Sequence, residues 1–259
     1  MHVRPLHLAS LALLASNLFA EPIPVRHIQG TAHGFLSIRS LDGKLLAAGD
    51  LIQVAHADRV TSRLTFHFRD GSLDDETTTF TQSGSFHLIS DHHIQRGPSF
   101  PKPLDLTIEA NGQLTFRILG GDGKPQTTQE HMDLPPDVAN GMQLTLLMNL
   151  SADSPEIKVP FVVTVGKPRL IHFAVKPEGE ETFTIGGVHR KATDFTVKPE
   201  LGGLVGLVAP LVGKQPPDCH VWIMEGLAPA FIREEGQLYY GGPIWRIEQI
   251  SAAFPAATR

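Results

Sequence analysis

The sequence contains almost no cysteine: Cys219 is the only thiol in 259 residues. A single cysteine excludes an intramolecular disulfide, and none follows the N-terminal apolar segment where a lipid could be attached. The chain also lacks an excess of basic residues, because 22 lysines and arginines stand against 27 acidic residues. This balance argues against nucleic acid or an anionic membrane surface as a partner, since both attract basic patches.

Long apolar runs are scarce as well. The N-terminal segment combines Arg4, an apolar stretch at 8–18, and Ala20 before an acidic residue. This arrangement predicts a cleaved secretory signal peptide at residues 1–20. A membrane anchor is the alternative, but the stretch is shorter than the roughly 20 residues that a spanning helix requires. We expect a periplasmic or secreted protein with no transmembrane segment in the mature chain.

Alternation of apolar and polar residues is the main pattern that the sequence does contain. In the segment 59–70, Val60, Leu64 and Phe66 fall on one face of an extended strand. Asn111-Gly112 separates two alternating segments and predicts a hairpin with a type I′ turn. With 24 glycines and 20 prolines, turns are expected to be frequent. From about residue 34 to 119 the pattern predicts a meander of six or seven strands.

The segment 120–134 has no periodicity and is predicted to be a loop. Apolar residues at helical spacing then predict a helix at 136–150. Further strands are expected at 161–165, 169–175, 181–185, 191–197, 220–224 and 237–250. The fold class is therefore mainly β (β-rich α+β), as a single domain over 21–259. Because short strands expose their edges unless the sheet curls, we expect a strongly curved antiparallel sheet or half-barrel, with one or two short helices against its concave side.

Four phrases carry a family resemblance. They are RGPSFPKPLDLTI (96–108), LPPDVANGM (134–142), GKQPPDCHVWI (213–223) and YYGGPIWRIE (239–248). Together they resemble a group of exported bacterial proteins of uncharacterised function, similar in build to the half-barrel fold of periplasmic lipoprotein carriers. The resemblance implies a place in the bacterial envelope and a curved sheet with a helix against it. It implies no catalytic residues.

The segment 86–94, FHLISDHHI, holds the best metal candidates. Strand alternation places His87, Asp91 and His93 on one face, and His67 could join them from a neighbouring strand. Residues two apart on a strand lie roughly 6–7 Å apart, so these donors converge only with help. The favoured interpretation is a solvated polar face that holds no metal. No cofactor is expected, and a metal-dependent hydrolase stays open as a third hypothesis.

Other chemistry-bearing residues favour structural roles. Cys219 and His220 are adjacent on a strand, so they point to opposite faces and do not form a nucleophile and base pair. Cys219 is interpreted as a buried, inert thiol. The acidic segment 70–76 is interpreted as a solubilising turn, because it lacks the ligand spacing of a calcium loop.

The run 201–213 is apolar, rich in glycine and too short to cross a bilayer. Such side chains need a cover, either the protein's own sheet or an outside hydrophobe. The sequence thus predicts an exported, non-enzymatic protein with an apolar cleft for a lipid-like or other hydrophobic ligand, or for a lipidated partner. An envelope scaffold or protein-interaction module is the alternative. The cleft residues expected from the two apolar segments are Val138, Met142, Leu146, Leu204, Leu207, Val208 and Leu211.

Overall fold

The computed structural model describes residues 22–119, 123–200 and 216–250. The predicted signal peptide and the apolar run 201–213 lie outside the described residues. The described part of the chain forms fourteen β-strands in one antiparallel sheet and one short α-helix. The predicted mainly β class is confirmed.

The sheet runs outward from β1 in both directions. Its order is β8-β7-β6-β5-β4-β3-β2-β1-β14-β13-β12-β11-β10-β9, so β8 and β9 are its two edges and the sheet is not closed. The strands are β1 (Ala32–Ser40), β2 (Leu45–His56), β3 (Arg59–Phe68), β4 (Leu73–Thr81), β5 (His87–Arg96), β6 (Leu104–Glu109), β7 (Gln113–Leu119), β8 (Pro125–His131), β9 (Ile157–Val163), β10 (Arg169–Ile185), β11 (Val188–Glu200), β12 (Cys219–Met224), β13 (Ala230–Gly236) and β14 (Trp245–Ile250). The helix α1 spans Gln143–Leu147.

The predicted hairpin at Asn111-Gly112 joins β6 to β7 and is confirmed, but its turn differs from the type I′ turn expected. Gly112 has a φ of 87°, whereas Asn111 is not in the positive-φ region. The Gly112 N–H donates to the carbonyl of Glu109 at 2.9 Å. This is the three-residue loop in which a left-handed glycine follows a type I turn.

The segment 120–134 was expected to be a loop, yet it contains β8. All seven residues of β8 are exposed, and the strand pairs with β7 along its length. Alternation fails to reveal β8 because neither of its faces is buried, so no apolar set is needed. Backbone hydrogen bonding to one neighbour is sufficient to define it.

The predicted helix at 136–150 is also wrong in extent, since α1 covers five residues of it. Asn140 explains the late start, because its side chain bonds both ways to Val162 of β9. The amide donates to the Val162 carbonyl at 3.0 Å and accepts from the Val162 N–H at 2.9 Å. Gly141 follows with a φ of 67°, which an α-helix does not allow.

In the second half of the sheet, from β9 to β14, the strands begin and end at other residues than the sequence predicts. The strands expected at 169–175 and 181–185 are one long strand, β10, which pairs with β11 through the hairpin at 186–187. In the segment 237–250 only β14 is a strand, and β13 was not predicted at all. Irregular pairing near Pro177 and Trp222 breaks the alternation in this half.

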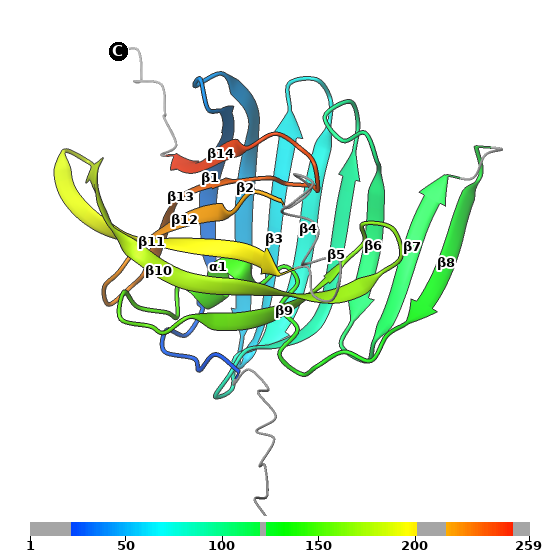
Figure 1. Cartoon of the computed structure of the whole chain (residues 1–259), viewed down its shortest axis with the longest axis horizontal. Coiled ribbons are helices and arrows are strands. Elements are labelled where there is room, and N and C mark those ends of the chain that lie inside the picture. Colours follow the sequence, from blue (N-terminus) through cyan, green and yellow to red (C-terminus); the bar gives the residue numbers. More distant parts are fainter. Residues whose placement is uncertain (1–21, 120–122, 201–215, 251–259) are drawn as a thin grey trace, which may run out of the picture.

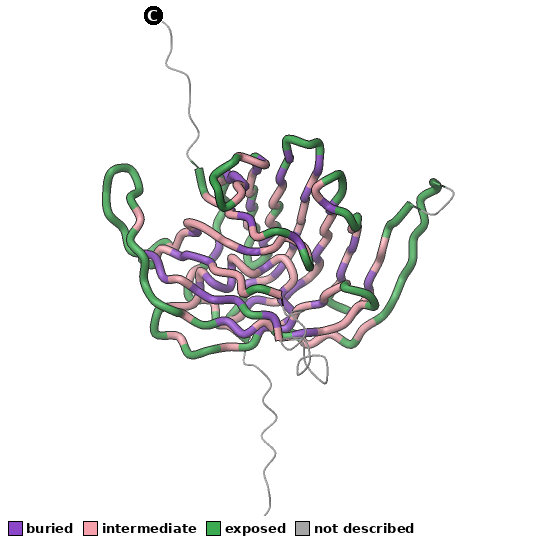
Figure 2. Tube along the Cα trace, turned by 45° about the horizontal axis from the view of Figure 1, so that its top comes forward, coloured by how far each residue is buried: buried purple, intermediate pink, exposed green. Residues whose placement is uncertain are grey.

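The strands of the two halves run in different directions, and β9 to β11 pass across one face of β3 to β6 (Figure 1). Buried residues concentrate where the two halves face each other, while the β10–β11 hairpin and β8 project into solvent (Figure 2). The largest fully buried side chains, Phe66, Phe80 and Phe195, come from both halves. We call the face of β3 to β6 that is covered in this way the inner face.

Candidate functional site

A bulge in β5 decides which side chains reach the inner face. Phe80 of β4 pairs with Leu88, but the next residue, Thr79, pairs with Ser90, so Ile89 is an extra residue. One extra residue reverses the alternation beyond it. Asp91 therefore lies on the same face as Leu88, and both are buried.

The same bulge separates His87 from Asp91 and His93, and the fourth metal candidate, His67, lies on β3. His87 precedes Ile89, so it does not share the face of Asp91 and His93, contrary to the alternation expected. It contacts the hydroxyl of Ser85 at 2.8 Å and the carbonyl of Pro136 at 3.0 Å. His67 is exposed beside the buried Phe66. No group of histidine, cysteine or acidic side chains suited to a metal ion occurs in the described part of the chain.

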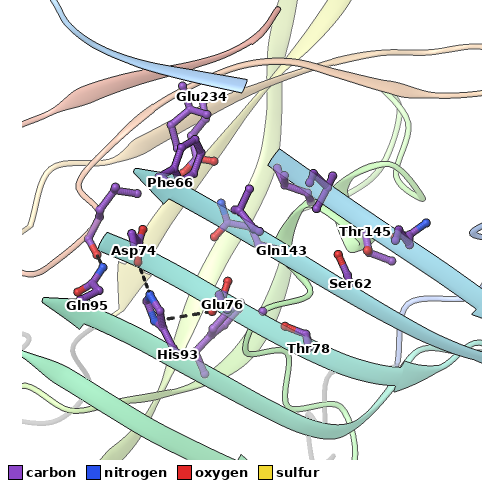
Figure 3. A pocket seen from close by; sticks show the side chains of 18 of the residues that line it. Ser62, Phe66, Asp74, Glu76, Thr78, His93, Gln95, Gln143, Thr145 and Glu234 are labelled. Carbon is purple, nitrogen blue, oxygen red and sulfur yellow. Dashed lines mark hydrogen bonds and ion pairs between the residues drawn. The ribbon is translucent and has the colours of Figure 1, made fainter. Parts of the chain in front are cut away.

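Asp91 and His93 instead belong to a group of titratable side chains from three strands. Figure 3 shows four of its members, Asp74, Glu76, His93 and Glu234. We call this group the inner cluster: Asp74 and Glu76 of β4, Asp91 and His93 of β5, and Glu234 of β13. His93 contacts Asp74 through Nε2 at 2.7 Å and Glu76 through Nδ1 at 3.8 Å. Asp91 accepts a hydrogen bond from the Thr78 hydroxyl at 2.9 Å.

Burial favours the neutral form of the acids in the inner cluster, whereas the neighbouring carboxyl groups favour the charged form of His93. Desolvation, reinforced by the charge of Glu76, raises the pKa of Asp91 to about 8. Desolvation also raises the pKa of Glu234 to about 7 and that of Glu76 above its usual value. Burial lowers the pKa of His93, but the charge of Glu76 and the bond to Asp74 outweigh it and raise the pKa to about 9. At neutral pH the cluster therefore contains a charged His93, in contact with Asp74, beside a protonated Asp91.

Cys219 adjoins the inner cluster. Its thiol donates to Glu234 Oε1 at 3.4 Å, and a Cβ added at Gly236 would lie 2.7 Å from its sulfur. Desolvation and the neighbouring Glu234 charge raise the pKa of Cys219 well above its usual value. Because the thiolate is the nucleophile, this environment makes Cys219 unreactive.

Two cavities border the inner cluster. The smaller, of about 190 Å³, lies between α1 and the inner faces of β3 and β4, and we call it the inner cavity. The larger, of about 390 Å³, lies between β5 and β6 on one side and β9 and β10 on the other, and we call it the cleft. Five residues line both cavities, so these are neighbouring spaces with a common wall: His93, Gln95, Gln143, Phe161 and Leu238.

The lining of the cleft is mainly apolar. Its apolar side chains come from both halves of the sheet: Leu104, Leu106 and Ile108 of β6, Phe161, Val162 and Val163 of β9, and Ile171 and Phe173 of β10. Asp91, His93 and Arg169 line it as well, together with Cys219, Tyr239 and Tyr240. The cleft is thus an apolar space with a few polar groups on its wall.

Three of the apolar residues expected to line a cleft fall within the described part of the chain. Val138, Met142 and Leu146 are buried in the hydrophobic core and do not line the cleft. Leu204, Leu207, Val208 and Leu211 lie outside the described residues. The β6 residues that do line the cleft were not singled out, although the alternation of Leu104, Leu106 and Ile108 was a usable signal.

Comparison with known proteins gives no family assignment. No protein-family model matches the chain, and no curated protein matches its sequence. No helix among the described residues is both long and apolar enough to span a membrane.

Proposed function

We propose that this is an exported, non-enzymatic envelope protein whose sheet forms a half-barrel that binds a lipid-like or other hydrophobic ligand in the cleft. The cleft itself carries the proposal. Its volume of about 390 Å³ falls in the range of about 300–1,000 Å³ typical of small-molecule sites. Apolar walls with a few polar groups are the usual composition of such sites.

Several properties of the chain support this role over catalysis. Cys219 is held as a neutral thiol, and His93 is engaged with Asp74. The N-terminal segment 1–20 has the pattern of a signal peptide, and the phrases that resemble exported bacterial proteins agree with a place in the envelope. A ligand of this kind would be a lipid or the acyl chain of a lipidated partner.

Ligand binding can be tested by native mass spectrometry of protein purified from a bacterial envelope, together with displacement of a neutral, environment-sensitive dye. The variant Val163→Trp places a bulky ring at the cleft wall and is expected to weaken dye binding by about tenfold or more. Val188→Trp is the matched control, because Val188 lies in the exposed β10–β11 hairpin. Absence of both bound lipid and dye displacement in the wild type would refute the proposal.

A protein-interaction role is the second candidate, and β8 favours it. This edge strand is exposed throughout and pairs only with β7 within the described residues. Such an edge can pair with a strand of another protein. A photocrosslinker at Gln129 of β8 should then capture specific partners, while one at Arg190 in the β10–β11 hairpin should not. Equal capture at both positions would count against this candidate.

A further inference from the structure

Arg169 has an unusual position at the start of β10. It pairs with Val163 of β9 and is two residues before Ile171, so both side chains lie on the same face of the strand. Both residues line the cleft together with Phe173. Arg169 is the one lysine or arginine among the described residues that line this space.

The guanidinium of Arg169 also has no hydrogen-bond or ion-pair partner among the described residues. Its Nε is shielded from solvent and makes no hydrogen bond, and no ion pair of Arg169 occurs in the described ranges. Other arginines of the sheet are paired: Arg63 contacts Asp75 at 2.7 Å, and Arg246 contacts Glu235 at 2.7 Å. An unsatisfied buried donor on a charged group is costly, so an anionic acceptor at this position would be favourable.

The remaining charged groups of the cleft do not oppose an anion. Asp91 is the one carboxyl group among the described lining residues, and desolvation raises its pKa to about 8, so it is mostly protonated at neutral pH. His93 and Cys219 also line the cleft with raised pKa values. Cys219 is thereby held as a neutral thiol, and His93 is paired with Asp74, which lies outside the cleft lining. The uncompensated charge in the cleft is therefore the positive charge of Arg169.

Resting on the hydrophobic-ligand function proposed above, we propose that the cleft selects amphiphiles with an anionic head group, carboxylate or phosphate, and that Arg169 binds this head group. The planar guanidinium can donate two parallel hydrogen bonds to either oxyanion. The alkyl chain lies against the apolar wall formed by Leu106, Ile108 and Phe173. Arg169 is thus a specificity-determining residue, and the apolar wall supplies affinity that does not depend on the head group.

The test compares three probes with the same alkyl chain: dodecanoic acid, dodecyl phosphate and dodecanol. Each displaces a neutral dye from the wild type, Arg169→Gln, Arg169→Lys and Arg190→Gln at neutral pH. Arg190→Gln is the matched control, because it removes one positive charge from the exposed β10–β11 hairpin. Binding of dodecanol by each variant confirms that the cleft is intact.

We expect the wild type to bind at least one anionic probe about tenfold or more tightly than dodecanol, in line with a charge-assisted hydrogen bond. Arg169→Gln should remove this preference by weakening the binding of the anionic probes far more than that of dodecanol. Arg169→Lys should keep part of it, and Arg190→Gln should keep all of it. The tighter of the two anionic probes identifies the head group as carboxylate or phosphate.

Two outcomes overturn the inference and leave the hydrophobic-ligand function standing. One is equal binding of all three probes by the wild type. The other is an anion preference that survives in Arg169→Gln, which would place head-group recognition elsewhere. Failure of all three probes to bind the wild type is a different result, since it contradicts the hydrophobic-ligand function itself and the inference with it.

Discussion

The two faces of β4 and β5 place the same residue types in opposite environments. On the outer face, Asp75 accepts hydrogen bonds from the Arg63 guanidinium at 2.9 and 2.7 Å, and this interaction lowers the pKa of Asp75. On the inner face, desolvation raises the pKa of Asp91 to about 8. The pKa of an aspartate is therefore lowered on the outer face of this pair of strands and raised on the inner face.

The two adjacent histidines of β5 show the same contrast. His92 contacts Asp105 at 2.9 Å with 39% of its side chain exposed, whereas His93 contacts Asp74 at 2.7 Å with 23% exposed. A buried ion pair adds little to stability compared with well-packed apolar side chains. Since apolar side chains could fill the same space, stability alone does not account for these residue types on the inner face.

The largest expected effect comes from a substitution at Gly141, in the loop that packs against the inner cluster. A Cβ at Gly141 would overlap the Thr78 hydroxyl and lie 2.6 Å from Asp91 Oδ1, at a φ of 67°. Gly141→Ala should therefore reduce the free energy of unfolding by about 3–5 kcal/mol, as overpacking adds to backbone strain. Urea denaturation measures the loss.

Gly166→Ala is the matched control for Gly141→Ala. Gly166 also has a positive φ, of 85°, but an added Cβ would meet nothing within 4 Å. This substitution should reduce the free energy of unfolding by about 1–2 kcal/mol, from backbone strain alone. Equal losses for the two variants would show that the loop does not press on Thr78 and Asp91.

The next prediction compares the loss of stability on replacing each of the two adjacent histidines of β5. His93→Ala leaves Asp74 without its buried partner and should reduce the free energy of unfolding by about 3 kcal/mol. His92→Ala removes a more exposed pair and should reduce it by less than about 1 kcal/mol. Thermal and urea denaturation of both variants test this difference. A loss for His92→Ala as large as that for His93→Ala would contradict the distinction between the two faces.

The last prediction is a pH dependence of stability, for which the expected change from a single group over one pH unit is small. Above its ordinary pKa of 3.8, Asp91 has released its proton in the unfolded chain but keeps it in the folded protein up to about pH 8. The unfolded state then binds fewer protons, so stability falls as pH rises, by up to about 1.4 kcal/mol per pH unit for each such group. Glu234 acts in the same direction up to about pH 7, and His93 from 6.5 up to about pH 9.

Stability should therefore decline from about pH 5 to about pH 9, and Asp91→Asn should make this decline shallower below about pH 8. Outer-face acids such as Asp75 have lowered pKa values and act in the opposite direction. Their contribution is lost below about pH 4, outside this window. Urea denaturation across the series tests the sign, and a stability that rises toward alkaline pH would contradict it.

The fold was predictable where alternation and turns coincide. The seven strands from β1 to β7 lie within the predicted meander, because each has one buried face and glycine turns such as Gly43 and Gly112 separate them. The β8 strand was not predicted, because both of its faces are exposed. The helix was placed too early, because the long-range bonds between Asn140 and Val162 leave no trace in local periodicity.

The inner cluster was missed for a related reason. The acidic residues Asp74 and Glu76 were interpreted as part of a solubilising turn. They occupy every second position of β4 and thus share a face with the buried Phe80. Counting back from Phe80 would have placed them on the inner face. The partner strand could not be aligned in the same way, because the extra residue at Ile89 has no signature in composition.

The unclosed sheet sets how the cleft can adjust its width. In a closed barrel, strand number and shear fix the girth. Here β8 and β9 are both edges, so no ladder of backbone hydrogen bonds ties one end of the sheet to the other in the described part of the chain. The spacing between β6 and β9 is therefore set by side-chain packing and not by strand pairing.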